Sequence, residues 1–329
     1  MSFTRFPHGV SSFGIPLFGN IPPLHPGDIH WVVSSKTTSS PMYTIISEQI
    51  EDGDIFSSMA TAYDSTTTNH NDVVILAPET HTISSSLTWA NYNTHLIGNH
   101  PGRVFQAHAA RFEASADFTP VITNSGYYNT WANLRIAHGR GTAANYIGVE
   151  MSGHYNYWNN VDLWSPGNVA EGADAGMVSM NLSGGNNYFE GCTIGGDSRL
   201  RSAANKTLDI KTNGVQNVFK DCVFMMYTDD AEAKFIWVSS GAGVQNRWTL
   251  FDNCTFIAYS VNWGTSITVA VGYNYSGGNG HRLLFKDCSF MGVTDVISSD
   301  DSYRNNCWFS GGNTYLGATT GTGLYAVST

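Results

Sequence analysis

Residues 219–224 read Phe-Lys-Asp-Cys-Val-Phe, and the same pattern returns as Phe251-Asp-Asn-Cys-Thr-Phe256 and Phe285-Lys-Asp-Cys-Ser-Phe290. Three earlier copies also begin with an aromatic residue and carry apolar residues at the fourth and sixth positions. Successive copies begin 27, 31, 30, 32 and 34 residues apart. A repeat of this period with variable insertions is typical of a solenoid, in which each repeat packs on its neighbours. The earlier copies are Trp131-Ala-Asn-Leu-Arg-Ile136, Trp158-Asn-Asn-Val-Asp-Leu163 and Phe189-Glu-Gly-Cys-Thr-Ile194.

Each copy requires a sharp bend at its third position. Side chains alternate across a strand, so the fourth and sixth positions share a face that the first position does not share. All three apolar side chains can point inward only if the chain bends between the first and the fourth. Asn, Asp and Gly tolerate the left-handed backbone conformation best. The third position holds Asn133, Asn160, Gly191, Asp221, Asn253 and Asp287, which we predict to be the bend residues.

A second strand precedes each copy. The apolar residues alternate with period two in Ile147/Val149/Met151 and in Ile267/Val269/Val271, and Gly-containing turns such as Ser183-Gly184-Gly185 follow several of these runs. One repeat is therefore a strand, a turn, a strand, a bend, a strand and a loop. Stacked repeats would pair every strand with the coils on both sides and would align the first positions as an aromatic column. That predicted column contains Phe189, Phe219, Phe251 and Phe285.

The fourth position holds a cysteine in four consecutive repeats. Cys192, Cys222, Cys254 and Cys288 lie 30 to 34 residues apart, whereas the ligands of a structural metal site converge at short spacing. Stacked coils would bring neighbouring cysteines within about 4.8 Å, but parallel Cβ directions give poor disulfide geometry. We therefore predict a buried column of free thiols and no metal site.

The composition favours an all-β chain. Charged residues make up 13% of the 329 residues, and 34 residues are Gly. Long amphipathic helices carry many charged residues on their wet face, whereas Ser, Thr, Asn and Gly suit strands and turns. The net charge of −10 leaves few basic residues to neutralise phosphates, so neither nucleic acid nor an anionic membrane surface is an expected partner.

The chain also shows no sign of export or of membrane insertion. Its first residues lack the apolar core of a signal peptide, and no apolar run approaches membrane-spanning length. Five cysteines, an odd number, argue against a secreted disulfide framework. We therefore expect assembly in a cytoplasm.

The repeats resemble those of pectate-lyase-like right-handed parallel β-helix proteins. The residues Asp72-Val-Val-Ile-Leu-Ala-Pro-Glu-Thr-His-Thr-Ile83 and Thr94-His-Leu-Ile-Gly98 resemble the first coils of that family, and Gly53–Tyr63 resembles its capping helix. The resemblance covers residues 45–315 and implies an all-β fold, a single-stranded right-handed parallel β-helix. We predict an extended Pro-rich arm at 1–30, a cap with a short helix at 31–70, the β-helix at 71–315 and a tail at 316–329.

The arm holds five of the ten prolines and several aromatic residues, so it needs another surface to bury against. Its opening, Thr4-Arg-Phe-Pro-His-Gly-Val-Ser-Ser-Phe-Gly14, resembles the start of tailed-bacteriophage particle proteins that carry a β-helix. That resemblance implies docking on a major capsid protein or another virion protein. The predicted docking residues are Phe3, Arg5, Phe6, Pro7, Phe13, Ile15 and Phe18.

Catalytic chemistry has few candidates. Asp229-Asp230 and Asp300-Asp301 are paired loop carboxylates that could act as acid and base on a glycan, but solvated loop tips explain them as well. Asp221 and Asp287 lie at predicted bends, where capping of the backbone explains them.

Family members that cleave acidic sugars use calcium-binding Asp residues and a basic catalyst, and that set does not map onto this chain. The nearest approach is Arg199 and Arg201 in a predicted loop after Asp197, while Glu171 and Asp174 lie in another Gly-rich loop. We therefore expect no catalytic residues, no metal and no cofactor.

Three functions remain open. The first is a virion structural protein that decorates the capsid or forms a head fibre, located on the virion surface. The second is a phage tailspike that binds or cleaves a bacterial surface polysaccharide. The third is a free polysaccharide lyase or glycoside hydrolase. The missing export signal and the unmapped catalytic set favour the first, and the long flat faces of a β-helix favour a homotrimer.

Overall fold

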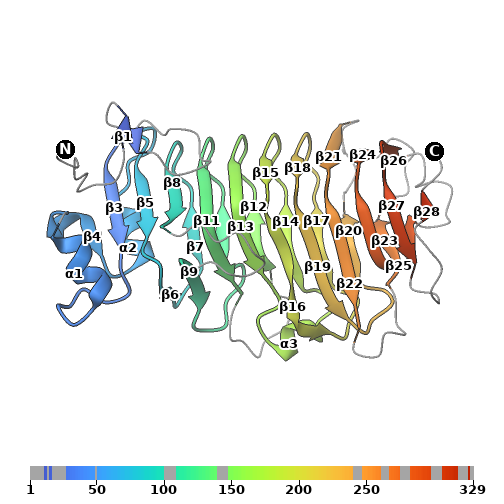
Figure 1. Cartoon of the computed structure of the whole chain (residues 1–329), viewed down its shortest axis with the longest axis horizontal. Helices are drawn as coiled ribbons and strands as arrows, with labels where there is room; N and C mark the ends of the chain where they lie inside the picture. Colours follow the sequence, from blue (N-terminus) through green and yellow to red (C-terminus); the bar gives the residue numbers. More distant parts are fainter. Residues whose placement is uncertain are drawn as a thin grey trace, which may run out of the picture.

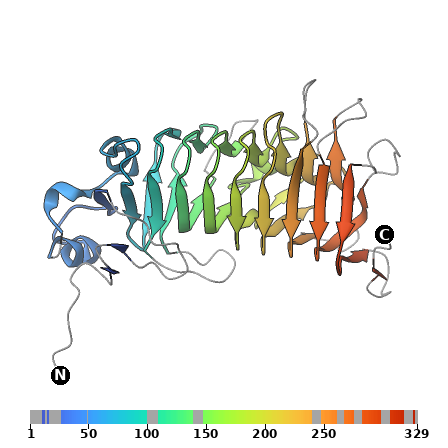
Figure 2. The same cartoon turned by 90° about the horizontal axis from the view of Figure 1, so that it is seen from above.

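A computed structural model describes residues 11–12, 15–16, 27–48, 50–99, 109–138, 147–239, 247–260, 267–274, 282–297, 306–317 and 325–326. These residues form a long solenoid of parallel strands with small helices at one end (Figure 1). The coils follow the sequence along the long axis, so the cap and the last coils lie at opposite ends (Figure 2). None of the helices in the described ranges has the length and apolar character that crossing a membrane requires.

Each coil contributes strands to three faces of the solenoid. The first and second faces meet at a sharp bend, which in one coil separates β15 (Tyr188–Glu190) from β16 (Thr193–Arg201). The third face is represented in that coil by β14 (Val178–Leu182). Neighbouring coils pair in register, as Phe189 with Phe219, Ile194 with Phe224 and Leu182 with Ile210 show. The all-β, single right-handed parallel β-helix that the repeats predict is confirmed.

The other strands take their places in the same three faces. The first face contains β3 (Ile29–Val32), β5 (Val73–Leu76), β8 (His95–Gly98), the first halves of β11 (Thr130–Ala137) and β13 (Tyr157–Trp164), β18 (Val218–Lys220), β21 (Trp248–Asp252), β24 (Arg282–Lys286) and β26 (Cys307–Ser310). The second contains β6 (Thr80–Ile83), β9 (Arg111–Ala114), the second halves of β11 and β13, β19 (Val223–Thr228), β22 (Thr255–Tyr259), the first half of β25 (Ser289–Ile297), whose second half pairs with β23 of the third face, and β27 (Thr314–Gly317), with β28 (Tyr325–Ala326) antiparallel to β27. The third contains β7 (Leu87–Trp89), β10 (Ile122–Asn124), β12 (Ile147–Met151), β17 (Lys206–Ile210), β20 (Lys234–Val238) and β23 (Ile267–Tyr273).

The bend residues adopt the left-handed conformation that the parity argument requires. The φ angles of the six third-position residues lie between +53° and +61°. This bend turns the first-position aromatic residues into the core, where Phe189, Phe219 and Phe251 stack at centroid distances of 4.5 and 5.0 Å. The column continues with Phe285 at 5.0 Å from Phe251. Stacked rings of this kind add to the stabilisation that burial of apolar area provides.

All five cysteines are buried free thiols. The Sγ of Cys222 donates to the carbonyl oxygen of Phe189 at 3.5 Å, and the Sγ of Cys254 donates to that of Phe219 at 3.3 Å. Each thiol therefore bonds to the coil before it. Burial raises the pKa of the Cys192, Cys222 and Cys254 thiols well above their usual range, so these three sulfur atoms are unreactive members of the core. Hydrogen bonding with Cys254 lowers the pKa of Cys288.

A ladder of buried asparagines runs along the turn between the third and first faces, and the sequence reasoning did not find it. The N–H of Asn129 donates to Oδ1 of Asn156 at 2.9 Å, and the N–H of Asn156 donates to Oδ1 of Asn187 at 2.9 Å. Asn217 continues the ladder by accepting the N–H of Asn187 at 2.8 Å. Each side-chain amide also donates to a carbonyl of the preceding coil, so buried backbone groups of the turns are satisfied.

The cap contains α1 (Pro41–Ser47) and α2 (Met59–Asp64), which lie beside the first coil (Figure 1). The predicted helix over Gly53–Tyr63 was wrong about its start. Asp52–Asp54 form a 3-10 turn, and Ile55 and Phe56 form the short strand β4, which pairs with Trp31 and Val32 of β3. Edge pairing with β3 therefore overrides the helical spacing of these apolar residues.

Candidate functional site

The carboxylate pairs do not assemble a catalytic centre in the described residues. Asp229 and Asp230 lie between β19 and β20, where Oδ1 of Asp230 accepts the N–H of Glu232 at 2.7 Å. That bond caps a turn, which is a structural use of the carboxylate. Asp300 and Asp301 lie outside the described residues.

The bend carboxylates also have structural partners. Oδ1 of Asp221 accepts a hydrogen bond from Nδ2 of Asn253 at 2.6 Å, and Oδ1 of Asp287 accepts one from the N–H of Gly312 at 2.6 Å. Both bonds join neighbouring coils at the bend, but only Asp287 accepts from a backbone N–H, whereas Asp221 accepts from a side-chain amide.

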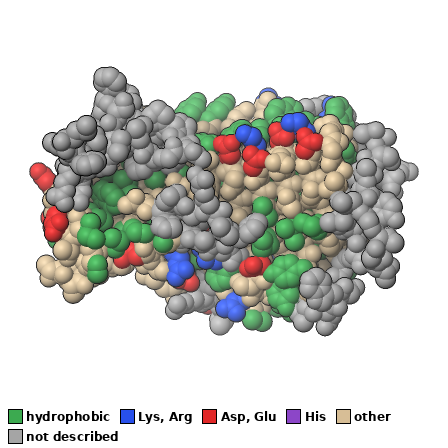
Figure 3. Space-filling view, in the orientation of Figure 1, with side chains coloured by type: hydrophobic (Ala, Val, Ile, Leu, Met, Phe, Trp, Pro, Cys, Tyr) green, Lys and Arg blue, Asp and Glu red, His purple; other side chains and the backbone are tan. Residues whose placement is uncertain are grey.

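Charged side chains alternate along the outer surface of the first face, where Figure 3 shows acidic and basic groups side by side at the upper right. Glu190 pairs with Lys220 at 3.0 Å, and Asp252 pairs with Lys286 at 3.0 Å. These exposed pairs link adjacent coils, and pairs of this kind contribute little stability. They favour the correct register between coils over a shifted one.

A different set of ionisable groups converges on the second face. Arg135 of β11 and Asp162 of β13 face each other in adjacent coils, with 3.6 Å between Nε and Oδ2. The guanidinium of Arg135 lies 4.8 Å from the ring centroid of Trp164. Arg135 is 9% exposed and Asp162 is 2% exposed, so this charged pair is almost completely removed from water.

Burial controls the protonation of this pair. It raises the pKa of Asp162 to about 7, while the guanidinium of Arg135 opposes the shift and Asp197 adds to it. Burial also lowers the pKa of Arg135. A carboxyl group that titrates near neutral pH can both give and take a proton, which is the property required of a general acid or base.

A buried polar network lies next to this pair, beneath the short helix α3 (Val169–Gly172). Glu171 is fully buried; its Oε2 accepts the N–H of Gly167 at 2.7 Å and lies 3.5 Å from Nδ1 of His138. Burial raises the pKa of Glu171 to about 7 and lowers that of His138 to about 3, so both are neutral at mildly acidic pH. Nδ1 of His138 also lies 3.2 Å from Oγ of Ser165. A nucleophile relay needs the hydroxyl and the acid on opposite ring nitrogens, so we interpret this cluster as structural.

Arg201 completes the network. It is fully buried, and its Nη2 donates to the carbonyl oxygen of Ser165 at 2.9 Å and to Oγ of Ser179 at 3.1 Å. Its Nη1 donates to Oδ1 of Asn205 at 3.3 Å. Arg199 and Arg201 lie within β16, so their predicted place in a loop was wrong. Arg201 attaches the segment before α3 to the second face.

The sequence contains a signal for the Arg135–Asp162 pair in one column of the repeats. Both residues occupy the fifth position of their repeats, where the later copies carry Thr, Val, Thr and Ser. Opposite charges in the same column of adjacent repeats face each other once the coils are in register. The partners of Glu171 and Arg201 gave no such signal, because loops of variable length bring them together.

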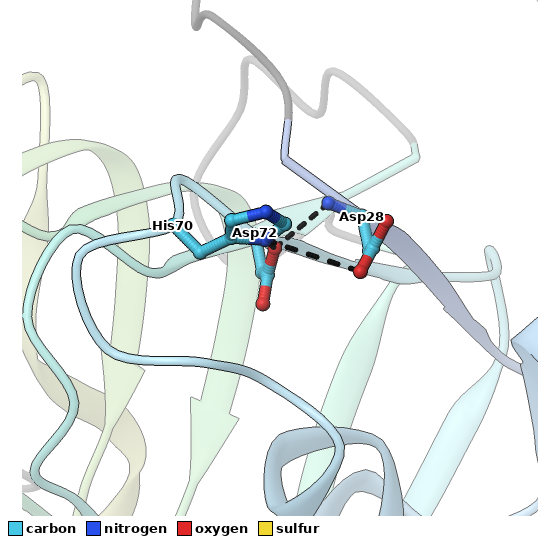
Figure 4. Close-up of side chains that lie close together, drawn as sticks. All are labelled: Asp28, His70 and Asp72. Carbon is cyan, nitrogen blue, oxygen red and sulfur yellow. Dashed lines mark hydrogen bonds and ion pairs between the residues drawn. The ribbon is translucent and has the colours of Figure 1, made fainter.

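A third cluster holds the start of the first coil, as Figure 4 shows. The carboxylate of Asp72 is fully buried and accepts the N–H of Asp28 at 2.7 Å and the N–H of Thr67 at 2.6 Å. Nδ1 of His70 lies 2.6 Å from Oδ1 of Asp72, and this hydrogen bond raises the pKa of His70. We call Asp28, His70 and Asp72 the first-coil latch.

The first-coil latch also brings three potential ligand atoms within 4.8 Å of one another. Both carboxylate oxygens of Asp72 already accept backbone N–H groups, and one of them also bonds to the imidazole. A metal ion would have to displace these hydrogen bonds from a carboxylate buried in the core. The oxygens of Asp72 are therefore used as hydrogen-bond acceptors that hold Asp28, Thr67 and His70 together, and we assign no metal ion to this cluster.

Most of the predicted docking residues lie outside the described residues. These are Phe3, Arg5, Phe6, Pro7, Phe13 and Phe18. Ile15 lies in β2 (Ile15–Pro16), which pairs antiparallel with β1 (Ser11–Ser12).

Comparison with known proteins identifies the fold alone. No family model matches the chain, and no curated protein matches it. A mutant pectin methylesterase in complex with a hexasaccharide superposes with a TM-score of 0.52 at 15% identity, covering 89% of this chain and 90% of that one. Pectin methylesterase from carrot superposes with a TM-score of 0.51 at 10% identity, covering 92% and 86%. ORF18 of Geobacillus virus E2 aligns at 12% identity, covering 78% of this chain and 57% of that one. Its TM-score of 0.43 is too low to support a conclusion about this chain.

Proposed function

We propose that this chain is a virion structural protein of a tailed bacteriophage, which docks through its amino-terminal arm and projects a rigid β-helix as capsid decoration or head fibre. The observation that carries the proposal is the connection between the arm and the first coil. The N–H of Gly27 donates to the carbonyl oxygen of Asn71 at 2.9 Å, and the N–H of Asp28 donates to buried Asp72. Residues 29–32 then pair in register with residues 73–76.

This connection suits a protein that is held by one end. Force on the arm passes through the first-coil latch into the parallel ladder of β3 and β5, whose hydrogen bonds lie in the body of the solenoid. β3, which follows the arm in the sequence, lies at one end of the long axis, so the remaining coils extend away from it (Figure 1). An anchor of this kind requires a stiff body and a firm attachment, and the described residues provide both.

The partners follow from the resemblance of residues 4–14 to the start of phage particle proteins. The proposed partner of the arm is the major capsid protein or another virion protein, which places the chain on the virion surface after assembly in the host cytoplasm. The long faces of the solenoid support side-by-side packing, and we include a homotrimer in the proposal because closed symmetric assembly is the rule for soluble oligomers.

Deletion of residues 1–26 is expected to leave a folded protein that no longer joins particles. The deletion ends at residue 26 because Asp28, Ile29 and His30, although within the predicted arm, belong to the first-coil latch and to β3. Loss of several aromatic anchors should reduce incorporation by at least about 100-fold, since a single anchor of this kind contributes about 2 kcal/mol or more. Incorporation is measured as the amount of protein that co-purifies with particles in a density gradient.

The matched control is a full-length chain in which Phe3, Phe6 and Phe13 are replaced by Ser. It keeps the arm's length and should fail to join particles to the same extent. Unchanged circular dichroism and thermal unfolding would show that the solenoid is intact in both variants. Normal incorporation of the truncated chain would overturn the proposal.

A second candidate function is the binding or cleavage of a bacterial surface polysaccharide, and the partly exposed Trp164 favours it. Its indole ring offers an apolar face to a sugar, whereas Arg135 and Asp162, which lie beside it, are almost completely buried and do not meet a substrate in this arrangement. Among the structural neighbours, pectin methylesterases are named for action on pectin. That activity belongs to those proteins. For this chain, the remaining alternative is a free polysaccharide lyase or glycoside hydrolase.

A panel of acidic, neutral and methyl-esterified oligosaccharides tests this second function. If it holds, the chain binds or converts at least one of them, and Trp164→Ala weakens binding about tenfold through loss of ring contact. The control is Trp308→Ala, because Trp308 is 53% exposed in the last coils, away from Arg135. Neither binding nor conversion across the panel would remove this function from consideration.

A further inference from the structure

Five aromatic rings, three of them exposed and two partly buried, form a row on three consecutive turns between the third and first faces. Tyr92 stacks on Tyr127 with 4.7 Å between centroids and an angle of 1°, and His154 meets Tyr127 edge-on at 5.1 Å. Beside them, Tyr128 stacks on Tyr155 at 5.1 Å. We call these five residues the tyrosine row. Tyr92, Tyr128 and Tyr155 are 38%, 53% and 50% exposed, which is unusual for stacked aromatic side chains.

The backbone conformation of these turns does not favour tyrosine. Tyr128 and Tyr155 adopt φ angles of +60° and +58°, in the left-handed region that bulky residues rarely occupy. The equivalent turn positions in neighbouring coils hold Asn93 and Asn186, whose φ angles are +49° and +59°. Asn tolerates this conformation better than Tyr does. The rings are therefore placed at strained positions where they remain half exposed, which indicates a contact surface.

The tyrosine row lies close to Gly27, at the start of the first coil. Gly27 bonds to Asn71, and in the same turn the N–H of Asn69 donates to the carbonyl oxygen of Tyr92 at 2.8 Å. The turn of Asn69 and Asn71 is thus the coil directly before the row. Three further coil steps of about 4.8 Å lead to Tyr155, a distance of about 14 Å.

The residues before Gly27 match this surface in chemistry and in length. They read Ile21-Pro-Pro-Leu-His-Pro26, a proline-rich run that contains no Asp, Glu, Lys or Arg. Proline-rich segments adopt the polyproline II conformation and dock on aromatic-lined surfaces. Five residues of polyproline II span about 15 Å at 3.1 Å each, which is enough to pass from the turn of Asn71 along the row, itself two coil steps or about 10 Å long, to Tyr155.

We propose that residues 21–26 lie on the tyrosine row of the same chain. The row then fixes the direction in which the arm leaves the solenoid, and residues 1–20 remain available to a partner. This assignment does not depend on the identity of that partner, and it holds whether or not the chain belongs to a virion.

Site-specific photo-crosslinking in the full chain tests the assignment. Leu24 is replaced by benzoylphenylalanine, and after irradiation the adducts are mapped by mass spectrometry. The expected result is an adduct within one chain, between residue 24 and residues 92–155. The same experiment is repeated in a Tyr128→Asn/Tyr155→Asn variant, because Asn occupies the equivalent positions of the neighbouring turns. The yield of the adduct should fall at least about fivefold, since most of the exposed ring area is lost.

The control background is Trp308→Asn, which removes an equally exposed ring far from the row and should leave the yield unchanged. Thermal unfolding of all variants confirms that the solenoid persists. Adducts between two chains would show that a second copy occupies the row and would overturn the assignment. Adducts elsewhere in the chain, or an unchanged yield in the tyrosine variant, would overturn it as well.

Discussion

Replacing Asn156 by alanine is expected to lower the free energy of unfolding by about 3 kcal/mol. Oδ1 of Asn156 accepts the N–H of Asn129, and its Nδ2 donates to the carbonyl oxygen of Gly126 at 3.0 Å. Asn156 is 1% exposed, so alanine would leave two backbone groups without partners in a region that water does not reach. Each such group costs about 1 to 3 kcal/mol. Chemical denaturation followed by circular dichroism measures the change.

Asn213→Ala is the matched control, because Asn213 lies in a turn of the same edge of the solenoid but is exposed. Its effect should stay within about 0.5 kcal/mol. Asn156→Asp should lower stability at neutral pH at least as much as Asn156→Ala, since it places a buried carboxylate oxygen against the carbonyl oxygen of Gly126. If Asn156→Ala is no less stable than the Asn213→Ala control, the ladder is not a significant source of stability.

The second large effect is a dependence of stability on pH that arises from Asp162. Burial raises the pKa of this carboxyl from 3.8 to about 7. The stability contributed by the protonated form is fully present below pH 3.8 and is lost as the pH rises through about 7. Asparagine cannot ionise, so Asp162→Asn should gain about 3 kcal/mol relative to the wild type between pH 5 and pH 8. Urea unfolding of both proteins at several pH values measures the difference.

The neighbouring groups make this prediction specific. Arg135 lowers the pKa of Asp162, so in an Arg135→Gln background the gain of Asp162→Asn should continue to grow to a higher pH. Glu171, whose pKa burial raises to about 7, contributes with the same sign as Asp162. His138 contributes with the opposite sign, because burial lowers its pKa to about 3 and its stability is lost as the pH falls below 6.5. If the free energies of unfolding of the wild type and of Asp162→Asn change in parallel from pH 5 to pH 8, Asp162 is ionised over that whole range and the prediction is wrong.

The first-coil latch and the asparagine ladder are related. Asp72 follows the left-handed residue Asn71 in its turn, as Asn129 follows Tyr128 and Asn156 follows Tyr155. In each case a buried side-chain oxygen accepts a backbone N–H of the preceding coil. Asp72 is therefore the first rung of the ladder, and it accepts the N–H of Asp28. The rung that holds the arm is ionisable, whereas the rungs inside the solenoid are neutral amides.

The fold followed from the sequence because its signal repeats. Residues such as Phe219, Asp221 and Cys222 lie at constant offsets within each copy, and strand parity converts those offsets into a bend and an inward face. The same reasoning failed over Gly53–Tyr63, where apolar residues at helical spacing are used by an edge strand. A local pattern does not reveal whether a free strand edge lies beside it.

The sequence by itself therefore determined the coil, its bend and its aromatic and cysteine columns, since these depend on alternation within six residues. Only the tertiary structure decided which polar groups meet. The Arg135–Asp162 pair depends on register between coils, and the contacts of Arg201 with Ser165 depend on loops whose lengths follow no rule. The strength of those contacts also depends on how deeply each side chain is buried. Asp162 is almost fully buried, which raises its pKa, whereas Tyr155 on the turns is half exposed. Burial is a property of the assembled coils, and no single repeat contains it.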